Sequence, residues 1–321
     1  MKVLITGGAG FIGSHIVDVL IEHGHTPFVV DNLASGSPKN LPPGIPLFEV
    51  DICDRKLLSG VFDQVRPDWV CHQAAQMSVS HSMRDPVFDA EVNVMGLLNV
   101  FDQAARVGVQ RLVFASSGGV LYGEVTTPAT ENSFQNPQSP YGISKWVGEK
   151  YLEFFARERT MQGVALRYSN VYGPRQNPHG EAGVVAIFAR TMLAAGTATI
   201  NGDGKYVRDY VYGPDVARAN VAALETKLAA NFTSVNIGTG IGVDVNEIAA
   251  FVAEQAQACL TDAKSHLRIP ACKYGPHRSG DLRSNLISPS LAGKILNWRP
   301  QVQLSEGIRE TVRWFDQNSP K

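Results

Sequence analysis

Hydrophobic residues in the first half of the chain gather in short runs, separated by longer segments in which apolar positions recur at helical spacing. The short runs predict strands at residues 2–6, 28–31, 47–51, 69–72, 111–115 and 163–169. Strands that alternate with helices favour a parallel sheet covered by helices on both faces. We therefore predict an α/β fold built on a doubly wound parallel sheet.

The pattern changes after residue 172, where strand-like runs at 206–213 and 234–238 are mixed with segments of helical periodicity. Helices are predicted at residues 183–195, 214–225, 244–259, 289–296 and 304–315. We expect residues 1–172 to form a nucleotide-binding domain and residues 173–321 to form mainly a smaller C-terminal α/β lobe that binds the substrate. We also expect the chain to return to the first domain around residues 205–240.

Composition narrows the class of protein. Hydrophobic residues make up 44% of the 321 residues, enough for a buried core, and the formal net charge is −1 with no basic stripe. This balance argues against nucleic acid and membrane surfaces as partners. No apolar run approaches the roughly 18 residues of a membrane-spanning helix, and the first predicted strand begins too early to leave room for a signal peptide.

Cysteines and histidines indicate neither a disulfide framework nor a metal site. The four cysteines are scattered without a CxxC pair, which is typical of reduced thiols in a cytoplasmic protein. His23 and His25 are close in sequence, but no acidic or cysteine residue stands at ligand spacing, so we expect no metal.

The first motif is a glycine-rich turn in "KVLITGGAGFIGSHIVDVL", between a predicted strand and an amphipathic helix. Gly7 permits a tight turn, Gly10 lets phosphates approach the backbone, and Gly13 lets the helix pack on the sheet. Asp31 ends the second predicted strand, where a carboxylate accepts hydrogen bonds from ribose hydroxyls and repels a 2′-phosphate. This pattern predicts a Rossmann fold that binds NAD rather than NADP.

The second motif is the pair Tyr141 and Lys145 in "SPYGISKWVGEKY". Their i, i+4 spacing places both on one face of a helix. A neighbouring ammonium and a positive nicotinamide favour the phenolate, and lowering the pKa of tyrosine from about 10 to about 7 requires roughly 4 kcal/mol. The spacing also arises by chance, so an exposed helix pair remains the alternative.

Together these motifs resemble those of the extended short-chain dehydrogenase/reductase family and, within it, the UDP-glucose (UDP-galactose) 4-epimerases. The likeness covers nearly the whole chain and extends to "CHQAAQMSVSHS", "NVMGLLNV", "ASSGGVLYGE", "LRYSNVYGPRQNPHGEAG", "INGDGKYVRDYVYGPDVA", "NIGTG", "HRSGDL" and "LNWRP". The resemblance implies NAD as cofactor, a UDP-sugar as substrate, and a homodimer formed by helices near residues 91–106 and 144–157.

The resemblance also implies which residues contact NAD. Asp31 and Asn32 would hold the adenosine ribose, and Asp51 and Ile52 would flank the adenine. The whole implied cofactor set is Gly7, Gly10, Phe11, Ile12, Gly13, Asp31, Asn32, Ser35, Gly36, Asp51, Ile52, Ala74, Ala75, Gln76, Asn93, Ser116, Tyr141, Lys145 and Tyr168.

A second implied set binds the substrate: Ser117, Tyr141, Asn170, Arg208, Arg278, Asp281 and Asn285. Arg208 and Arg278 would hold the diphosphate, for which an arginine fork suits better than a lysine; surface ion pairs are the alternative. Asp281 would bind the uridine ribose. Asn285 stands where related enzymes gate the size of the sugar, although it could instead bond local backbone.

One position departs from the family. A serine or threonine four residues before the tyrosine of "YG" normally bonds the reacting sugar hydroxyl, and here that position is Gly118. Ser117 is the nearest substitute, or a water fills the space, and we expect Gly118→Ser to be tolerated. Positions 119 and 120 are Gly and Val, where related dehydratases carry an Asp–Glu pair, so elimination of water is disfavoured.

We therefore expect an NAD-dependent enzyme that inverts carbon 4 of a UDP-hexose through a transient 4-keto intermediate. Tyr141, Lys145 and Ser117 are the expected catalytic residues. Two alternatives stay open: another nucleotide-sugar enzyme of this fold, acting on a UDP-uronic acid or a UDP-N-acetylhexosamine, and a non-catalytic NAD-binding protein, which Gly118 motivates.

Overall fold

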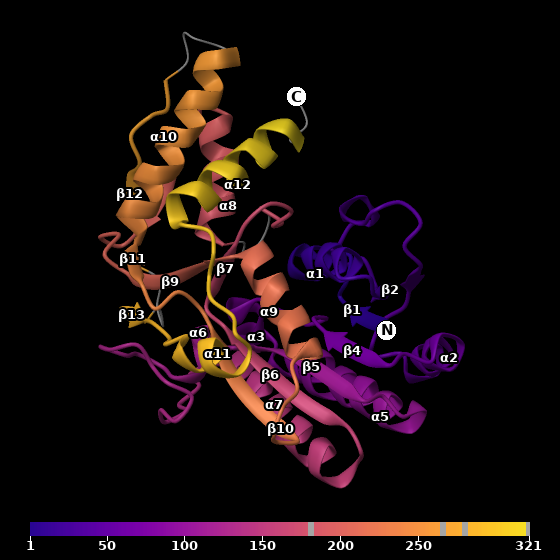
Figure 1. Cartoon of the computed structure of the whole chain (residues 1–321). Coiled ribbons are helices and arrows are strands. Elements are labelled where there is room, and N and C mark those ends of the chain that lie inside the picture. The colour runs from indigo at the N-terminus through magenta and orange to yellow at the C-terminus, as the bar shows by residue number, and fades with distance from the viewer. Residues whose placement is uncertain (179–182, 264–267, 278–281, 319–321) are drawn as a thin grey trace.

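A computed structural model describes residues 1–178, 183–263, 268–277 and 282–318. Its centre is a seven-stranded sheet in the order β10-β6-β5-β4-β1-β2-β3, with every neighbouring pair parallel. The strands are β1 (Lys2–Thr6), β2 (Thr26–Asp31), β3 (Leu47–Glu49), β4 (Trp69–His72), β5 (Arg111–Ser117), β6 (Gln162–Tyr168) and β10 (Phe232–Ile237). The predicted doubly wound α/β fold is confirmed (Figure 1).

Helices cover both faces of this sheet, because successive strand residues point to opposite sides. Val3 and Ile5 belong to a core shared with α1 (Phe11–Glu22), α9 (Gly213–Glu225) and the segment around α11 (Ser290–Ile295). Leu4 points the other way, into a core shared with the opposite helices. Those helices are α2 (Arg55–Val65), α5 (Leu97–Val107) and α7 (Pro140–Glu158).

Short helical elements connect the strand ends on the side where the expected site residues lie. They are η1 (Pro38–Asn40), α3 (Val79–Arg84), α4 (Pro86–Ala90), the π-helix η2 (Glu91–Gly96) and α6 (Gly118–Leu121). Parallel strands end together at one edge of a sheet, so these connections bring residues distant in sequence to the same place.

A second body lies beyond that edge, at the top of Figure 1. Its helices are α8 (Val184–Leu193), α10 (Val245–Ala263) and α12 (Leu304–Asn318), which share a hydrophobic core. Two small sheets complete it: β7 (Asn170–Tyr172), β9 (Val207–Tyr212), β11 (Gly242–Asp244) and β13 (Ser284–Asn285), and separately β8 (Thr199–Asn201) with β12 (Lys273–Gly275).

The chain crosses between the two bodies more than once. After β9 it returns to the main sheet through α9 and β10, and α11 also packs against that core. The domain limits at residues 172 and 173 therefore stay a prediction, because elements from the second half complete the larger body.

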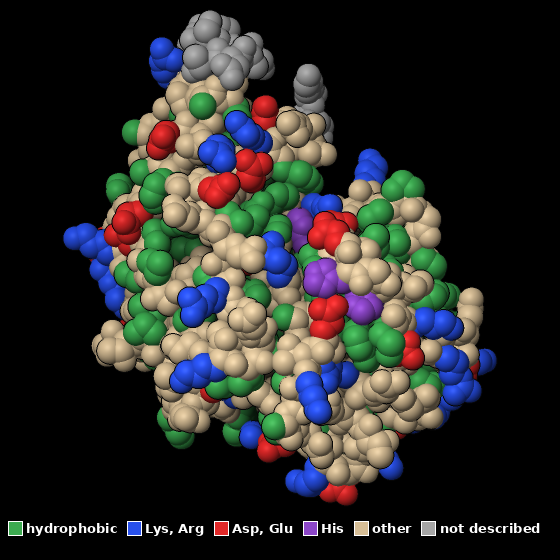
Figure 2. Space-filling view, in the orientation of Figure 1, with side chains coloured by type: hydrophobic (Ala, Val, Ile, Leu, Met, Phe, Trp, Pro, Cys, Tyr) green, Lys and Arg blue, Asp and Glu red, His purple; other side chains and the backbone are tan. Residues whose placement is uncertain are grey.

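Figure 2 shows lysine and arginine side chains interspersed with acidic ones over the visible face. Within the described ranges, no helix combines the length and apolar character needed to cross a membrane.

Candidate active site

The glycine-rich turn between β1 and α1 has the geometry that its sequence predicts. Gly7 has a φ of +69°, and a Cβ there would lie 2.7 Å from the backbone nitrogen of Ala74. A Cβ on Gly13 would overlap the carbonyl oxygen of Gly7. Gly10 caps α1, so the free N–H groups at the start of that helix face the turn. This backbone fits a pyrophosphate, because no side chain stands between it and an anion.

Asp31 at the end of β2 is fixed against the same turn. Its Oδ2 accepts from the Ala9 nitrogen at 3.0 Å, and its Oδ1 accepts from the Leu33 nitrogen at 2.8 Å. Burial raises the pKa of Asp31, while these backbone N–H groups favour its charged form. A carboxylate has further lone pairs available for ribose hydroxyls. A Cβ added at Gly36 would lie 3.0 Å from either carboxylate oxygen of Asp31. Because glycine has no side chain, the backbone at Gly36 can lie close to this acid.

The expected adenine-side residues also lie together. Asn32 Nδ2 donates to Asp51 Oδ2 at 2.8 Å, linking the ends of β2 and β3. Ile52 is buried. The turn, Asp31 and this pair therefore form one continuous edge suited to a dinucleotide.

A polar cluster joins the loop after β4 to the helices beside it. Asn93 holds Gln76 by two bonds: its Oδ1 accepts from the Gln76 nitrogen at 2.9 Å, and its Nδ2 donates to the Gln76 carbonyl at 2.8 Å. Both side chains also donate to Asp89, which is fully buried. Asp89 is absent from the sites expected from sequence, and only its place in an otherwise apolar helix could have signalled it.

Tyr141 and Lys145 lie in the first turns of α7, a helix that begins with Ser139 as its N-cap and Pro140 at its first position. Lys145 is buried, and its Nζ donates to the Ala115 carbonyl at 2.9 Å and lies 5.6 Å from the centre of the Tyr141 ring. Burial lowers the pKa of Lys145 to about 8, and the negative charge of Asp89 opposes that change.

The protein's own groups do not make Tyr141 a phenolate. Burial raises the pKa of Tyr141, the charge of Asp89 raises it further, and a hydrogen bond with Ser117 lowers it. Lowering the pKa of Tyr141 toward neutral pH, as the sequence predicts, therefore requires positive charge from outside the chain. A nicotinamide ring would supply that charge.

The end of β5 explains Gly118. A Cβ on Gly118 would lie 2.9 Å from Cδ1 of Ile287 and 3.3 Å from the Arg167 carbonyl oxygen. A side chain at position 118 would therefore press on Ile287, which is buried. The hydroxyl of Ser117 is beside Tyr141, so Ser117 stays a predicted substitute for the missing hydroxyl, with a water as the alternative.

Ser116 points into a buried ion pair behind the site. Its Oγ donates to Glu149 Oε1 at 2.5 Å. Arg167 binds the same carboxylate in bidentate fashion, from Nε at 2.9 Å and from Nη2 at 2.6 Å. Arg167 Nη1 also donates to the hydroxyl of Tyr122 at 2.7 Å. Sequence reasoning missed Glu149 and Arg167, which join α7 to β6.

Other expected cofactor residues are placed with different partners. The Tyr168 hydroxyl is buried on the α9 side of the sheet and donates to Asn220 Oδ1 at 2.9 Å. Ala74 and Ala75 lie partly buried in the loop that follows β4, directly against the glycine turn at Ala74. Ser35 is exposed between β2 and η1.

Of the expected substrate residues, Asn170, Arg208 and Asn285 lie on β7, β9 and β13, while Ser117 and Tyr141 lie on β5 and α7. Arg208 and Asn285 are direct partners in the β9–β13 pairing. Asn285 is 1% exposed, and its Nδ2 donates to the Gly123 carbonyl at 3.1 Å, while its buried Oδ1 has no partner among the described residues. Asn170 donates to the Asp209 carbonyl at 3.4 Å. Arg278 and Asp281 lie outside the described residues.

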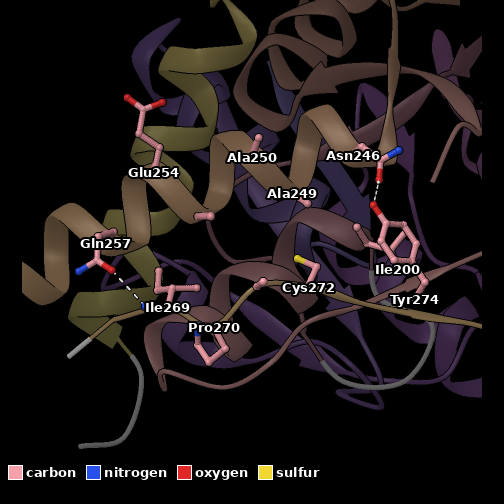
Figure 3. A pocket seen from close by; sticks show the side chains of 12 residues that line it. Ile200, Asn246, Ala249, Ala250, Glu254, Gln257, Ile269, Pro270, Cys272 and Tyr274 are labelled. Atoms are coloured by element: carbon pink, nitrogen blue, oxygen red, sulfur yellow. Dashed lines mark hydrogen bonds between the residues drawn. The ribbon is translucent and has the colours of Figure 1, made fainter. Parts of the chain in front are cut away.

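Other hollows and clusters lie apart from this chemistry. A groove of about 490 Å³ runs along α10 and contains none of the expected site residues (Figure 3). At the surface, His23 and His25 both bond Glu225, at 3.1 and 2.9 Å. In the described part of the chain, no group of three His, Cys, Asp or Glu side chains is arranged to hold a metal ion.

The sheet, the glycine turn with its acid, and the Tyr–Lys pair beside Ser117 together define a dinucleotide-dependent α/β enzyme of the extended short-chain dehydrogenase/reductase type. The chain belongs to the NAD dependent epimerase/dehydratase family, whose sequence model matches residues 3–238. The family resemblance and the NAD cofactor expected from the sequence are thus confirmed.

Similar proteins extend over the whole chain. It is 39% identical over 325 residues to UDP-glucose 4-epimerase of Mycolicibacterium smegmatis, covering 99% of this chain and 100% of that one. UDP-glucose 4-epimerase of Thermotoga maritima, solved with UDP-glucose, is 44% identical with a TM-score of 0.92 over 99% of both chains. The Thermus thermophilus UDP-glucose 4-epimerase, solved with NAD, is also 44% identical, with a TM-score of 0.90 over 100% of both chains.

Proposed function

We propose that this protein is an NAD-dependent epimerase that inverts carbon 4 of a UDP-hexose, interconverting UDP-glucose and UDP-galactose. The observation that carries the proposal is the grouping of Tyr141, Lys145 and Ser117 beside a dinucleotide-binding edge. Two solved proteins named UDP-glucose 4-epimerase, from Thermotoga maritima and Thermus thermophilus, are each 44% identical in sequence to this chain. A relative named for UDP-N-acetylglucosamine 4-epimerase activity is 31% identical, so the UDP-hexose assignment has the stronger support.

The residues divide the reaction between them. The bound cofactor's chemistry is the reversible acceptance of a hydride from carbon 4. Tyr141 takes the proton of the sugar's 4-hydroxyl and later returns it to the 4-keto group. Ser117 would bond the same oxygen, and Lys145 would hold the nicotinamide ribose and stabilise the phenolate.

Inversion requires the 4-ketosugar to turn while the rest of the substrate stays bound. Arg208 lies on β9, where it pairs with Asn285 of β13, and its Nη1 donates to the Val207 carbonyl at 2.9 Å. We assign the diphosphate to Arg208, with Arg278 as its expected second partner. Asn285, adjacent to Arg208 in the sheet, has a buried oxygen available for a sugar group.

Purified protein mixed with UDP-galactose tests the function directly. We expect UDP-glucose to form without added NAD, because NAD is regenerated in every turnover and does not need to dissociate from the enzyme. Denatured protein would be assayed for released NAD. Absence of product when NAD is present in excess would refute the proposal, and a product that differs at another carbon would redirect it.

We further propose that the enzyme acts as a homodimer, in the cytoplasm, in galactose metabolism. The dimer has support from apolar side chains exposed on neighbouring elements α4, η2 and α7. These are Val87, Phe88, Met95, Trp146, Tyr151 and Phe154, each at least 37% exposed. A second copy of this chain is the partner that we assign to this apolar face.

A further inference from the structure

A buried carboxylate lies between the loop expected to bind the cofactor and the helix that carries Tyr141. Asp89 lies in the short helix α4 and is 0% exposed. It belongs to neither the expected catalytic set nor the expected binding set. Burying a charge is costly unless the surroundings compensate it, so Asp89 calls for an explanation.

Three neutral side chains of the described residues donate hydrogen bonds to Asp89. Oδ1 accepts from Gln76 Nε2 at 2.8 Å and from Asn93 Nδ2 at 2.9 Å. Oδ2 accepts from Ser144 Oγ at 2.6 Å. Among the described residues, no lysine or arginine forms an ion pair with it. No ion pair among the described residues therefore neutralises its charge, and the bond to Ser144 ties it to the helix that carries Tyr141 and Lys145.

The next residue on α7 after Ser144 is Lys145, one helical turn beyond Tyr141. Lys145 has no carboxylate within ion-pair distance in the described chain, and its Nζ is bound to a neutral carbonyl and lies 5.1 Å from the centre of the Phe114 ring. Asp89 is the acidic group that acts electrostatically on both Lys145 and Tyr141. A carboxylate at this place favours the ammonium of one and the neutral phenol of the other.

Other titratable groups around the pair are engaged or neutral. Burial lowers the pKa of His72 on β4 to about 3, so it carries no charge near neutral pH. Glu149 on α7 is neutralised by Arg167 on β6. On α3, the ring of His81 stacks on Phe88 of α4.

We propose that Asp89 is a positioning residue that sets the proton balance of the Tyr141–Lys145 pair, by favouring the ammonium form of Lys145 and the neutral phenol of Tyr141. The proposal rests on the epimerase function proposed above. The positive nicotinamide ring of bound NAD would act on Tyr141 in the opposite direction, so the charge of Asp89 helps to set the pH at which the phenolate forms.

Asp89→Asn tests the charge with little change of shape. The new Oδ1 still accepts from Gln76 and Asn93, and the new Nδ2 donates to Ser144 Oγ, because a serine hydroxyl both donates and accepts. Losing the negative charge favours phenolate and disfavours ammonium. Both limbs of the pH profile of kcat should therefore move to lower pH, by about one unit.

A second measurement does not depend on turnover. Protein loaded with NAD and labelled at tyrosine Cζ would be titrated by NMR, with the Tyr141 signal assigned from its absence in Tyr141→Phe. We expect this signal to titrate at lower pH in Asp89→Asn than in wild type. This readout still tests Asp89 if the wild-type protein fails to epimerise UDP-galactose, so the two failures are distinguishable.

Ser144→Ala is the matched control, because it removes the hydrogen bond and keeps the charge. It should lower thermal stability and leave the Tyr141 titration in place. An Asp89→Asn protein with reduced kcat but an unmoved Tyr141 titration would overturn the proposal. If Asp89→Asn does not fold, NMR of wild-type protein labelled at aspartate Cγ decides: a protonated Asp89 at the assay pH would equally overturn it.

Discussion

Among single residues, the proposed reaction depends most directly on Tyr141. We expect Tyr141→Phe to keep NAD and the UDP-sugar bound, because the ring and its packing remain, and to lose most of kcat with the transferable proton. The measurement is kcat with UDP-galactose, together with the NAD content of the purified variant. Activity above about a tenth of wild type, a barrier change below about 1.4 kcal/mol, would contradict the role.

Gly118 is a packing position in the structure, and the expectation that Gly118→Ser is tolerated is revised. The added side chain would press on Ile287, which is fully buried. We expect a loss of unfolding free energy of about 1–3 kcal/mol from overpacking, measured by urea denaturation.

The double variant Gly118→Ser with Ile287→Ala provides the control, because it removes the two methyl groups of Ile287, Cδ1 and Cγ2, that a side chain at position 118 would contact. It should be more stable than the sum of the two single changes predicts. Strict additivity would show that Ile287 is not what excludes a side chain at Gly118.

Asn285 is the residue whose two proposed roles differ most in their consequences. Its Nδ2 bonds the Gly123 backbone, as the local alternative requires, yet its Oδ1 is buried without a partner in the described chain. If that oxygen faces the sugar, Asn285→Ser should raise kcat/KM for UDP-N-acetylglucosamine relative to UDP-glucose, and Asn285→Tyr should lower it. Unchanged ratios in both variants would leave only the backbone role.

At the scale of elements, the buried salt bridge between Glu149 and Arg167 connects α7 to β6 behind the catalytic residues. Both side chains are 3% exposed and share a bidentate contact. Arg167→Met should cost about 3–5 kcal/mol of unfolding free energy, because it leaves the Glu149 charge buried and uncompensated. Thermal or urea unfolding measures the loss.

The double variant Arg167→Met with Glu149→Met separates a buried charge from lost packing. Replacing both partners by apolar groups of similar volume should recover most of the stability. If the double variant is no more stable than Arg167→Met alone, the loss comes from the bonds to Tyr122 and to the backbone instead.

The elements that were predictable from sequence are those whose signal is local. Strand β1, the glycine turn and α1 follow one another within a single stretch, so apolar runs and glycines suffice to place them. The spacing of Tyr141 and Lys145 is likewise a property of one helix. β5 runs on to Ser117, two residues past its predicted end, and β3 stops at Glu49.

What sequence could not supply is contact between distant segments. The proposed role of Asp89 depends on its hydrogen bonds with Gln76, which comes earlier in the chain, and with Ser144 on another helix. Gly118 is explained by Ile287, which comes from the last part of the chain. Both contacts exist only because parallel strands bring their ends to one edge of the sheet, a tertiary effect that no local pattern encodes.

At the scale of the whole molecule, the proposed homodimer would bury the apolar face formed by α4, η2 and α7. Phe88, Trp146 and Phe154 are 39, 37 and 45% exposed on elements that pack against one another. A stable interface of standard size buries about 1,600 Å², and removing aromatic side chains from water supplies much of the gain.

Light scattering on the purified protein should give about twice the chain mass of 34.8 kDa. Trp146→Glu with Phe154→Glu should convert it to a monomer, because two carboxylates would be buried unpaired in each half of the interface. Phe134→Glu is the matched control, since Phe134 is 84% exposed but lies between α6 and α7, outside this face, and the control should remain a dimer. A wild-type monomer at micromolar concentration, or a double variant that still dimerises, would assign these apolar side chains to another partner.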